Sequence, residues 1–287
     1  SGGGSVTDGF RLYSGSSGST IRGFNIRNFT QDGIDIWQSN NNYIVGNYIG
    51  TTVNGTAGAQ NLNGINIFSA SGNMIGGTNA LDRNVISGNG SSGVYITGGA
   101  NNQLLGNYIG LNATGTAAVA NGVNGVHVYQ STGTIIGNGT TAGRNVLSGN
   151  TQRGIFLDDA DNTLIRGNYV GTNAAGAADV NGTTSNLLQT GIVATGGSTG
   201  VQIGGTAVGQ GNVISGNNWY GVELTAAGTS NNSVLGNYIG TDASGTFAVG
   251  NIYGVSIFNA ASNNFVGGGI AGAGNVISGN LGQGVFI

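Results

Sequence analysis

Residues 84–97 read NVISGNGSSGVYIT, and both phrases in this stretch recur along the chain. The first phrase, Asn-Val-Ile-Ser-Gly-Asn, returns at Asn145 (as NVLSGN), Asn212 and Asn275. The second phrase, called the Gly-Val mark below, is a glycine followed by Val or Ile, then any residue, then Ile, Val, Leu or Ala. It starts at Gly33, Gly64, Gly93, Gly125, Gly154, Gly191, Gly221, Gly254 and Gly284. The first and last of these marks are 251 residues apart, so the chain is an internal repeat with a period of about 31 residues.

A third phrase alternates with the first, and together they predict the fold. It reads GNYIG and begins at Gly46, Gly106, Gly167 (as GNYVG) and Gly236. Within each repeat, apolar residues alternate with polar ones, β-branched types dominate, and glycine or asparagine interrupts each short run. This pattern favours strands over helices. Three strands per repeat predict an all-β fold, a right-handed parallel β-helix of about nine turns that forms one domain over residues 1–287.

Asparagine occupies one equivalent place in every repeat, just before the second apolar segment. In a stacked coil these side chains would form a ladder, each amide bonding to the turns above and below. The predicted ladder consists of Asn25, Asn47, Asn84, Asn107, Asn145, Asn168, Asn212, Asn237 and Asn275.

The interval between a ladder asparagine and the next Gly-Val mark alternates between short and long. The long intervals contain small, polar insertions at residues 51–63, 111–124, 172–190 and 241–253. A second set of excursions follows Ile75, Ile136, Ile203 and Val266. We expect both sets to project from alternate turns as two rows of loops along the rod.

Composition excludes several classes of protein. The chain has 60 glycines but neither proline nor cysteine, which excludes a collagen helix, a disulfide scaffold and a zinc–thiolate site. Charged residues make up 6% and the net charge is −3, so a nucleic-acid partner is not expected. No apolar run reaches the ~20 residues of a membrane-spanning helix.

The phrases GNYIGTDASGT (residues 236–246), GNVISGN and GVxI resemble the Asn/Gly-rich right-handed β-helix repeats of large bacterial secreted or surface proteins. The resemblance implies an extracellular location, in the medium or on the cell surface, and neighbouring modules in a longer chain. Pectate-lyase-like proteins, which act on polysaccharides, share this fold, but a fold does not transfer a function. The chain closes inside a strand-like segment, residues 285–287. We therefore expect either a fragment of a longer chain or an uncapped subunit that self-associates through its end strands.

The strand that begins at each Gly-Val mark should send alternate side chains outward. Aromatic residues would then gather on one outer face over the first five turns. Three interpretations stay open for this face: the long loops cover it, copies of the chain associate through it, or it binds glycans by stacking on sugar rings. The candidate ligand-binding residues are Trp37, Phe68, Tyr95, Tyr129 and Phe156.

Polar residues that could carry chemistry are concentrated near the fifth turn. The only histidine, His127, precedes Asp158 by one turn, and Asp159 and Asp161 follow Asp158 directly. Asp158, Asp159 and His127 are the candidate catalytic residues for glycoside cleavage, since paired carboxylates can act as acid and base. Asp158, Asp159 and Asp161 are the candidate ligands for Ca²⁺, the one cofactor considered. An ordinary solvated turn is the third interpretation.

These observations predict a non-catalytic structural or adhesive β-solenoid module that forms a rigid rod or stacks into fibres. The outward columns vary along the rod without converging on one chemical constellation, and charges are sparse. The alternative is a polysaccharide lyase, a glycoside hydrolase or a glycan-binding module of the same fold. Expected partners are further domains, further copies or glycans.

Overall fold

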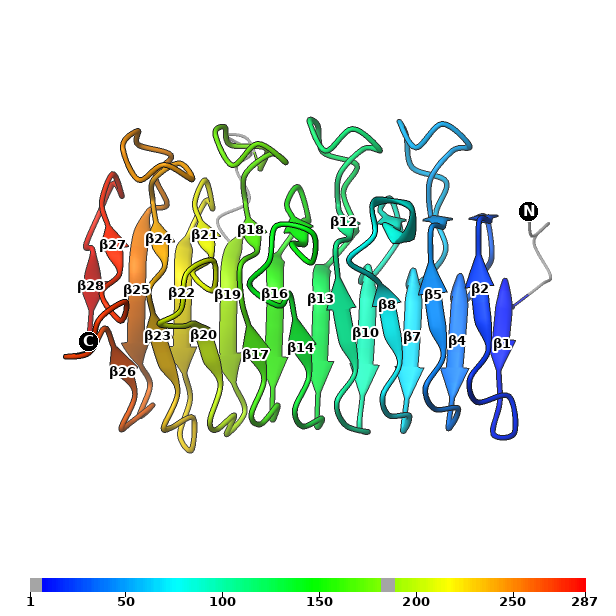
Figure 1. Cartoon of the computed structure of the whole chain (residues 1–287), viewed down its shortest axis with the longest axis horizontal. Helices are drawn as coiled ribbons and strands as arrows, with labels where there is room; N and C mark the ends of the chain where they lie inside the picture. The colour runs from blue at the N-terminus through cyan, green and yellow to red at the C-terminus, as the bar shows by residue number, and fades with distance from the viewer. Residues whose placement is uncertain (1–6, 182–188) are drawn as a thin grey trace.

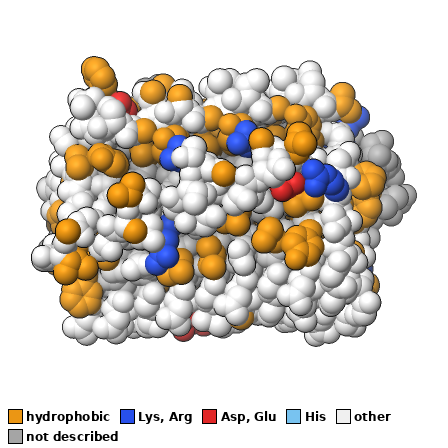
Figure 2. Space-filling model, in the orientation of Figure 1, with side chains coloured by type: hydrophobic (Ala, Val, Ile, Leu, Met, Phe, Trp, Pro, Cys, Tyr) orange, Lys and Arg blue, Asp and Glu red, His pale blue; other side chains and the backbone are white. Residues whose placement is uncertain are grey.

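The computed structural model describes residues 7–181 and 189–287. The chain winds into a rod, and the first and last described strands lie at opposite ends (Figure 1). Three parallel sheets run along the rod, and each successive turn contributes one strand to each sheet. This arrangement is a right-handed parallel β-helix and confirms the predicted fold. Charged side chains are few and scattered on the face seen in Figure 2.

The first sheet has ten strands, and the other two have nine each among the described residues. The strands of the first sheet are β1 (Phe10–Leu12), β4 (Ile34–Trp37), β7 (Ile65–Phe68), β10 (Val94–Thr97), β13 (Asn124–Tyr129), β16 (Arg153–Asp158), β19 (Thr190–Thr195), β22 (Tyr220–Thr225), β25 (Tyr253–Phe258) and β28 (Val285–Phe286). Those of the second sheet are β2 (Thr20–Arg22), β5 (Tyr43–Val45), β8 (Met74–Gly76), β11 (Gln103–Leu105), β14 (Ile135–Ile136), β17 (Leu164–Ile165), β20 (Gln202–Gly204), β23 (Ser233–Leu235) and β26 (Phe265–Val266). Those of the third sheet are β3 (Asn25–Ile26), β6 (Tyr48–Ile49), β9 (Val85–Ile86), β12 (Tyr108–Ile109), β15 (Val146–Leu147), β18 (Tyr169–Val170), β21 (Val213–Ile214), β24 (Tyr238–Ile239) and β27 (Val276–Ile277).

The first sheet has one strand more than the nine Gly-Val marks predict. The additional strand, β1, follows Gly9, where the sequence has Phe10 in place of Val or Ile. Phe10 nevertheless pairs with Ile34 of β4 and packs on the core, so an aromatic residue fills the position usually taken by a β-branched one. The only helix among the described residues is a 3₁₀ turn, Ala80–Asp82, and none is long and apolar enough to cross a membrane.

The core is a stack of aliphatic side chains inside the coil. In the first sheet, Ile36, Ile67 and Ile96 lie in register on neighbouring strands and are fully buried. β-branched residues suit this position because their restricted side chains pack well on a pleated surface. Each turn therefore buries apolar surface against the turns on both sides, as repeat architectures require.

The asparagine ladder is confirmed from Asn47 to Asn275. At each step the side-chain Nδ2 donates to the Oδ1 of the next asparagine; for Asn107 and Asn145 the distance is 3.0 Å. The same Oδ1 also accepts the backbone N–H of the preceding asparagine. Including Asn25 in the ladder was wrong, because the N–H of Phe24 donates to Asn47 at that step. Asn25 lies one residue later in the register and donates instead to the carbonyls of Thr51 and Thr52.

Further asparagine ladders that the sequence analysis did not identify run at other corners of the coil. One starts Asn42–Asn73–Asn102. Another starts Asn61–Asn89–Asn121–Asn150 and has a counterpart in Asn181–Asn217–Asn251–Asn280. These amides occupy buried corners, where they satisfy backbone groups that the turns leave unpaired.

The predicted insertions form a row of hairpin loops along one edge of the rod (Figure 1). Antiparallel bridges close them at Thr51–Gly58, Leu111–Ala118, Thr172–Asp179 and Thr241–Ala248. The loops contact one another, since the N–H of Ala113 donates to the Gly55 carbonyl at 3.0 Å, and equivalent bonds link the later loops. Part of the predicted insertion 172–190, residues 182–188, lies outside the described residues.

Candidate functional site

The outer face of the first sheet holds the residues that the sequence analysis selected. The predicted alternation is confirmed, because Ile34 and Ile36 are fully buried while Trp37 on the same strand is 37% exposed. Strand register places one outward column in the predicted order: Asp35, Asn66, Tyr95, His127, Phe156, Val193, Glu223, Ser256 and Phe286. The second column runs Trp37, Phe68, Thr97, Tyr129, Asp158 and Thr195.

Some residues of the first column point outward from the coil and are nevertheless shielded from solvent. Asp35, Val193 and Ser256 are almost completely buried. Asp35 accepts hydrogen bonds from Arg11 Nε at 2.8 Å and from Asn66 Nδ2 at 2.9 Å, so neighbouring strands close over its carboxylate. The face is therefore divided into covered stretches and open ones.

The five predicted aromatic residues fall into two clusters. The rings of Trp37 and Phe68 stack with centroids 4.1 Å apart. Two strands further along, the ring of His127 lies between those of Tyr95 and Phe156, at 4.8 and 4.7 Å. Tyr129 lies beside this group, 6.4 Å from His127. The histidine, which the sequence analysis treated as a catalytic candidate, is thus the central ring of an aromatic stack.

A groove of about 290 Å³ opens beside this stack. Its aromatic wall is formed by Tyr95, His127 and Phe156, and its polar wall includes Ser92, Asn124 and Arg153. The polar wall is a third outward column, because β13 and β16 begin one residue before the Gly-Val mark and pair Asn124 with Arg153. Alternation counted from the Gly-Val mark did not predict this column. The residue directly preceding each Gly-Val glycine was the signal that could have identified it.

Two buried polar atoms in the groove have no hydrogen-bond partner among the described residues. They are Oδ1 of Asn124, a residue that is 2% exposed, and Nε2 of His127. Burial, followed by the charge of Arg153, lowers the pKa of His127 to about 4, so the imidazole is neutral at pH 7. An unpaired buried polar group costs about 1–3 kcal/mol. Both atoms have almost no exposed surface, so a ligand hydroxyl would pair with them, and remove that cost, only after a rotation of the side chain toward the groove.

Arg153 supplies the one positive charge at the groove wall. Its guanidinium carbon lies 4.4 Å from the centre of the Phe156 ring, and Nη1 donates to Gln152 Oε1 at 3.1 Å. Burial lowers the pKa of Arg153, and Glu223, two turns further along the first column, opposes that shift. Burial likewise raises the pKa of Glu223, and the charge of Arg153 opposes the shift. Arg153 lies over an aromatic ring and can donate to a ligand.

Strand register pairs His127 with Phe156, and Asp158 with Tyr129, so the predicted acid–base residues are not register partners. Asp158 lies in the second column beside Tyr129 and Thr195, and neither Asp158 nor Asp159 is a hydrogen-bond partner of the histidine. Asp159 is exposed, with a left-handed backbone at φ 53°. Burial, then the neighbouring Asp159, raises the pKa of Asp158. These residues form a polar turn at the end of β16.

The predicted calcium ligands belong to the same turn. Oδ1 of Asp161 accepts hydrogen bonds from both the N–H and the hydroxyl of Thr199, each at 2.8 Å, and so ties this turn to the next one. Nowhere in residues 7–181 and 189–287 do three or more His, Asp or Glu side chains converge to hold a metal ion. Calcium binding by Asp158, Asp159 and Asp161 stays a prediction.

A third aromatic cluster lies on the same sheet nearer its C-terminal end, and the sequence analysis did not include it. Tyr220 and Tyr253 pair in register, with ring centroids 5.2 Å apart. Trp219 meets the edge of each ring at 5.2 and 5.4 Å, and Phe258 lies 5.8 Å from Tyr220. Both tyrosines directly precede a Gly-Val glycine, the position occupied by Asn124 and Arg153 in earlier turns.

The fold and this face define a parallel β-helix protein with an aromatic groove on one sheet. No family model matches the chain, and no curated protein matches it. Among solved structures, it is similar to the A-module of the Azotobacter vinelandii mannuronan C-5 epimerase AlgE6, with 17% identity over 96% of this chain and a TM-score of 0.45. It is also similar to the Dettilon tailspike protein gp208, with 15% identity over 98% of this chain and a TM-score of 0.39. The chain spans 55% and 60% of the lengths of these two structures.

Proposed function

We propose that this chain is a non-catalytic, adhesive β-helix module that binds glycans in the groove beside Tyr95, His127 and Phe156. The observation that carries the proposal is the pairing of ring faces with unpartnered polar atoms in one groove. Sugars present apolar C–H faces that stack on aromatic rings and hydroxyls that donate and accept hydrogen bonds. Both features of the groove match this combination.

In this proposal each wall of the groove has its own role toward a sugar. Tyr95 offers its ring, Phe156 supports Arg153, which lies over it, and Asn124 Oδ1 accepts a hydroxyl proton once its side chain turns toward the groove. Nε2 of the neutral His127 pairs with a second hydroxyl, and Arg153 donates to a ring or hydroxyl oxygen. The rod beneath contributes rigidity: the strands that carry these residues are hydrogen-bonded on both sides, so little conformational entropy is lost on binding.

The proposal includes no catalytic step, and cleavage by Asp158, Asp159 and His127 stays the alternative that the experiment below tests. In its biological setting such a module would work outside the cell, where polysaccharides are displayed. Association of copies through the end strands stays a separate prediction.

A glycan panel tests the proposal. Neutral and acidic oligosaccharides would be titrated into the chain and binding followed by calorimetry, together with product analysis to detect cleavage. We expect binding without cleavage, and a loss of about tenfold or more in Tyr95→Ala. Tyr43→Ala removes an exposed tyrosine from the second sheet and should leave binding unchanged.

Two outcomes would count against the proposal. Absence of binding across the panel would remove the glycan-binding role. Cleavage that disappears when Asp158 and Asp159 are both replaced by Asn would replace it with the enzymatic alternative.

A further inference from the structure

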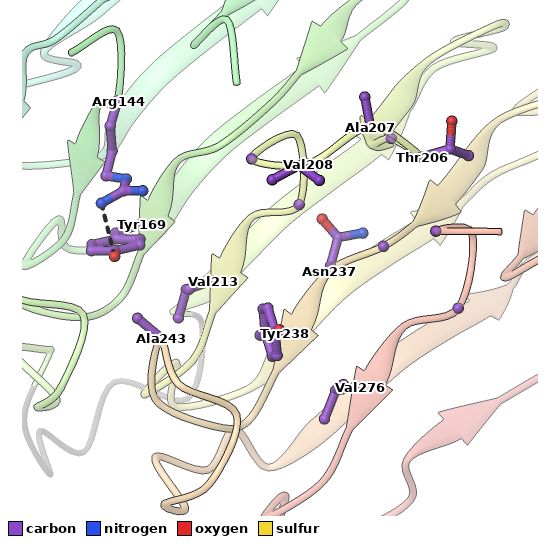
Figure 3. Close-up of a pocket in the computed structure, with 16 residues that line it drawn as sticks. Arg144, Tyr169, Thr206, Ala207, Val208, Val213, Asn237, Tyr238, Ala243 and Val276 are labelled. Atoms are coloured by element: carbon purple, nitrogen blue, oxygen red, sulfur yellow. Dashed lines mark hydrogen bonds between the residues drawn. The ribbon is translucent and has the colours of Figure 1, made fainter. Parts of the chain in front are cut away.

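A second groove, of about 440 Å³, lies over the outer face of the third sheet and is separate from the site above. Its floor includes Tyr169, Val213, Tyr238 and Val276, which lie in register on β18, β21, β24 and β27. Residues 205–209 form one wall and Ala243 of the last hairpin loop belongs to the other (Figure 3). Tyrosine and valine alternate along this floor.

Each tyrosine of this column is held from one side by a hairpin loop. A Cβ built on Gly115 would lie 2.9 Å from the Tyr108 ring, one on Gly176 would lie 2.7 Å from the Tyr169 ring, and one on Gly245 would lie 2.6 Å from the Tyr238 ring. The loops therefore need glycine here, and the rings are fixed before anything else binds.

In two turns the chain covers the tyrosine with its own arginine. The guanidinium carbon of Arg83 lies 4.2 Å from the centre of the Tyr108 ring, and that of Arg144 lies 4.0 Å from the centre of the Tyr169 ring. Each arginine also donates from Nε to the carbonyl of the glycine two residues before that tyrosine, at 3.0 Å. Arg144 Nη1 reaches the Tyr169 hydroxyl at 2.8 Å (Figure 3).

At Tyr238 the repeat continues but the arginine is missing. Arg83 and Arg144 directly precede the ladder residues Asn84 and Asn145, and the corresponding residue before Asn212 is Gly211. A Cβ on Gly211 would lie within 1.9 Å of the Gly236 carbonyl oxygen, so no side chain can extend from this position. Among the side chains drawn in Figure 3, none lies over Tyr238 as Arg144 lies over Tyr169.

We propose that this groove binds an arginine side chain presented by a partner polypeptide. The chain itself shows which group fits, because a guanidinium lies over the tyrosine of two earlier turns, Tyr108 and Tyr169. A planar cation stacks favourably on the face of a tyrosine, and its N–H groups can donate to a backbone carbonyl, as those of Arg83 and Arg144 do. Apolar residues on either side of that arginine could pack on the groove, since Val208 of the wall is fully exposed and Val276 of the floor is 39% exposed.

The experiment follows the Tyr238 ring by NMR in the full chain. The probe is a short capped peptide with one arginine between two leucines, compared with otherwise identical peptides that contain citrulline or lysine. Citrulline keeps the planar shape without the charge, and lysine keeps the charge without the plane. We expect saturable shifts of Tyr238 with arginine and binding about tenfold weaker with either analogue.

Two variants separate a site from general packing effects. Tyr238→Leu should weaken peptide binding about tenfold, whereas Tyr108→Leu removes a tyrosine already covered by Arg83 and should leave binding unchanged. Equal binding of the three peptides, or shifts that avoid Tyr238, would overturn the proposal. Oligosaccharides that displace the arginine peptide and shift Tyr238 more strongly would also overturn it, by assigning the groove to sugars.

Discussion

The ring of His127 lies against the ring of Phe156 on the next strand, with centroids 4.7 Å apart, while its Nε2 is buried without a hydrogen-bond partner. At His127 the packing of the ring is therefore favourable, whereas the burial of its unpaired nitrogen is unfavourable. The ring stabilises the aromatic stack, and the unpaired nitrogen destabilises it. This conflict resembles that of a binding residue whose polar partner is supplied by a ligand.

Replacing His127 by Phe should separate these two effects. The phenyl ring keeps the stack and removes the unpaired nitrogen, so the free energy of unfolding should rise by about 1 kcal/mol. Glycan binding should weaken several-fold, because one hydrogen-bond partner is lost. Urea unfolding and calorimetry measure the two quantities. A variant that is less stable yet binds normally would contradict both expectations.

Acidification should lower the free energy of unfolding through the same residue, His127. The pKa of His127 is about 4 in the folded chain and 6.5 in an ordinary environment, so between these values the unfolded chain takes up the proton and the folded chain does not. Stability contributed by the neutral imidazole is therefore complete above pH 6.5 and is lost as the pH falls toward 4. The difference in unfolding free energy between wild type and His127→Phe, measured across this range, should widen on acidification. A difference independent of pH would contradict the assigned pKa.

The asparagine ladder predicts a large loss of stability at a single buried amide. Nδ2 of Asn107 donates to the Ile75 carbonyl at 2.8 Å and to Asn145 Oδ1, and its Oδ1 accepts from Asn84. Asn107→Ala should lower the free energy of unfolding by about 3 kcal/mol, because it leaves several buried groups unpaired. Asn25→Ala is the matched control, with an expected loss of about 1 kcal/mol, since Asn25 lies outside the ladder. Equal losses would show that ladder position is unimportant.

The packing of the hairpin loops predicts that Gly176 tolerates no side chain. Gly176 has φ +68°, and a Cβ there would lie 2.7 Å from the Tyr169 ring and 2.8 Å from Ala243 Cβ. Gly176→Ala should therefore lower the free energy of unfolding by about 2 kcal/mol. Gly269→Ala serves as the control, because a Cβ there meets nothing within 4 Å and its φ lies outside the left-handed region. Thermal unfolding of the two variants side by side measures the difference.

Much of the fold could be predicted because its determinants are local and repeated. Alternation around each Gly-Val mark identified which side chains face the core, and the strand register confirms that order from Asp35 to Phe286. The displacement of Asn25 shows where pattern matching fails. In the first turn Phe24 takes the ladder position and its backbone N–H donates to Asn47, so Asn25 lies one residue further along the chain.

The candidate site was only partly predictable. Its aromatic wall, Tyr95 and Phe156, was identified from alternation, but Asn124 and Arg153 were not recognised as an outward column. Strands β13 and β16 begin earlier than the Gly-Val mark because their neighbours offer backbone partners there. The residue before each Gly-Val glycine marks this column in the sequence, but whether a strand extends to it depends on pairing between turns.

The sequence by itself determined the class of architecture, because a repeat of about 31 residues with period-two alternation can bury its apolar face only by stacking turns. Only the tertiary structure decided which outward residues are covered, which form grooves and which arginine lies over which tyrosine. Those outcomes depend on side chains about 23 to 40 residues apart in the chain, such as Arg144 and Tyr169 or Asn124 and Arg153, that meet when one turn lies on the next. Such contacts follow from how neighbouring turns and loops pack, and the spacing of residues within one turn does not specify them.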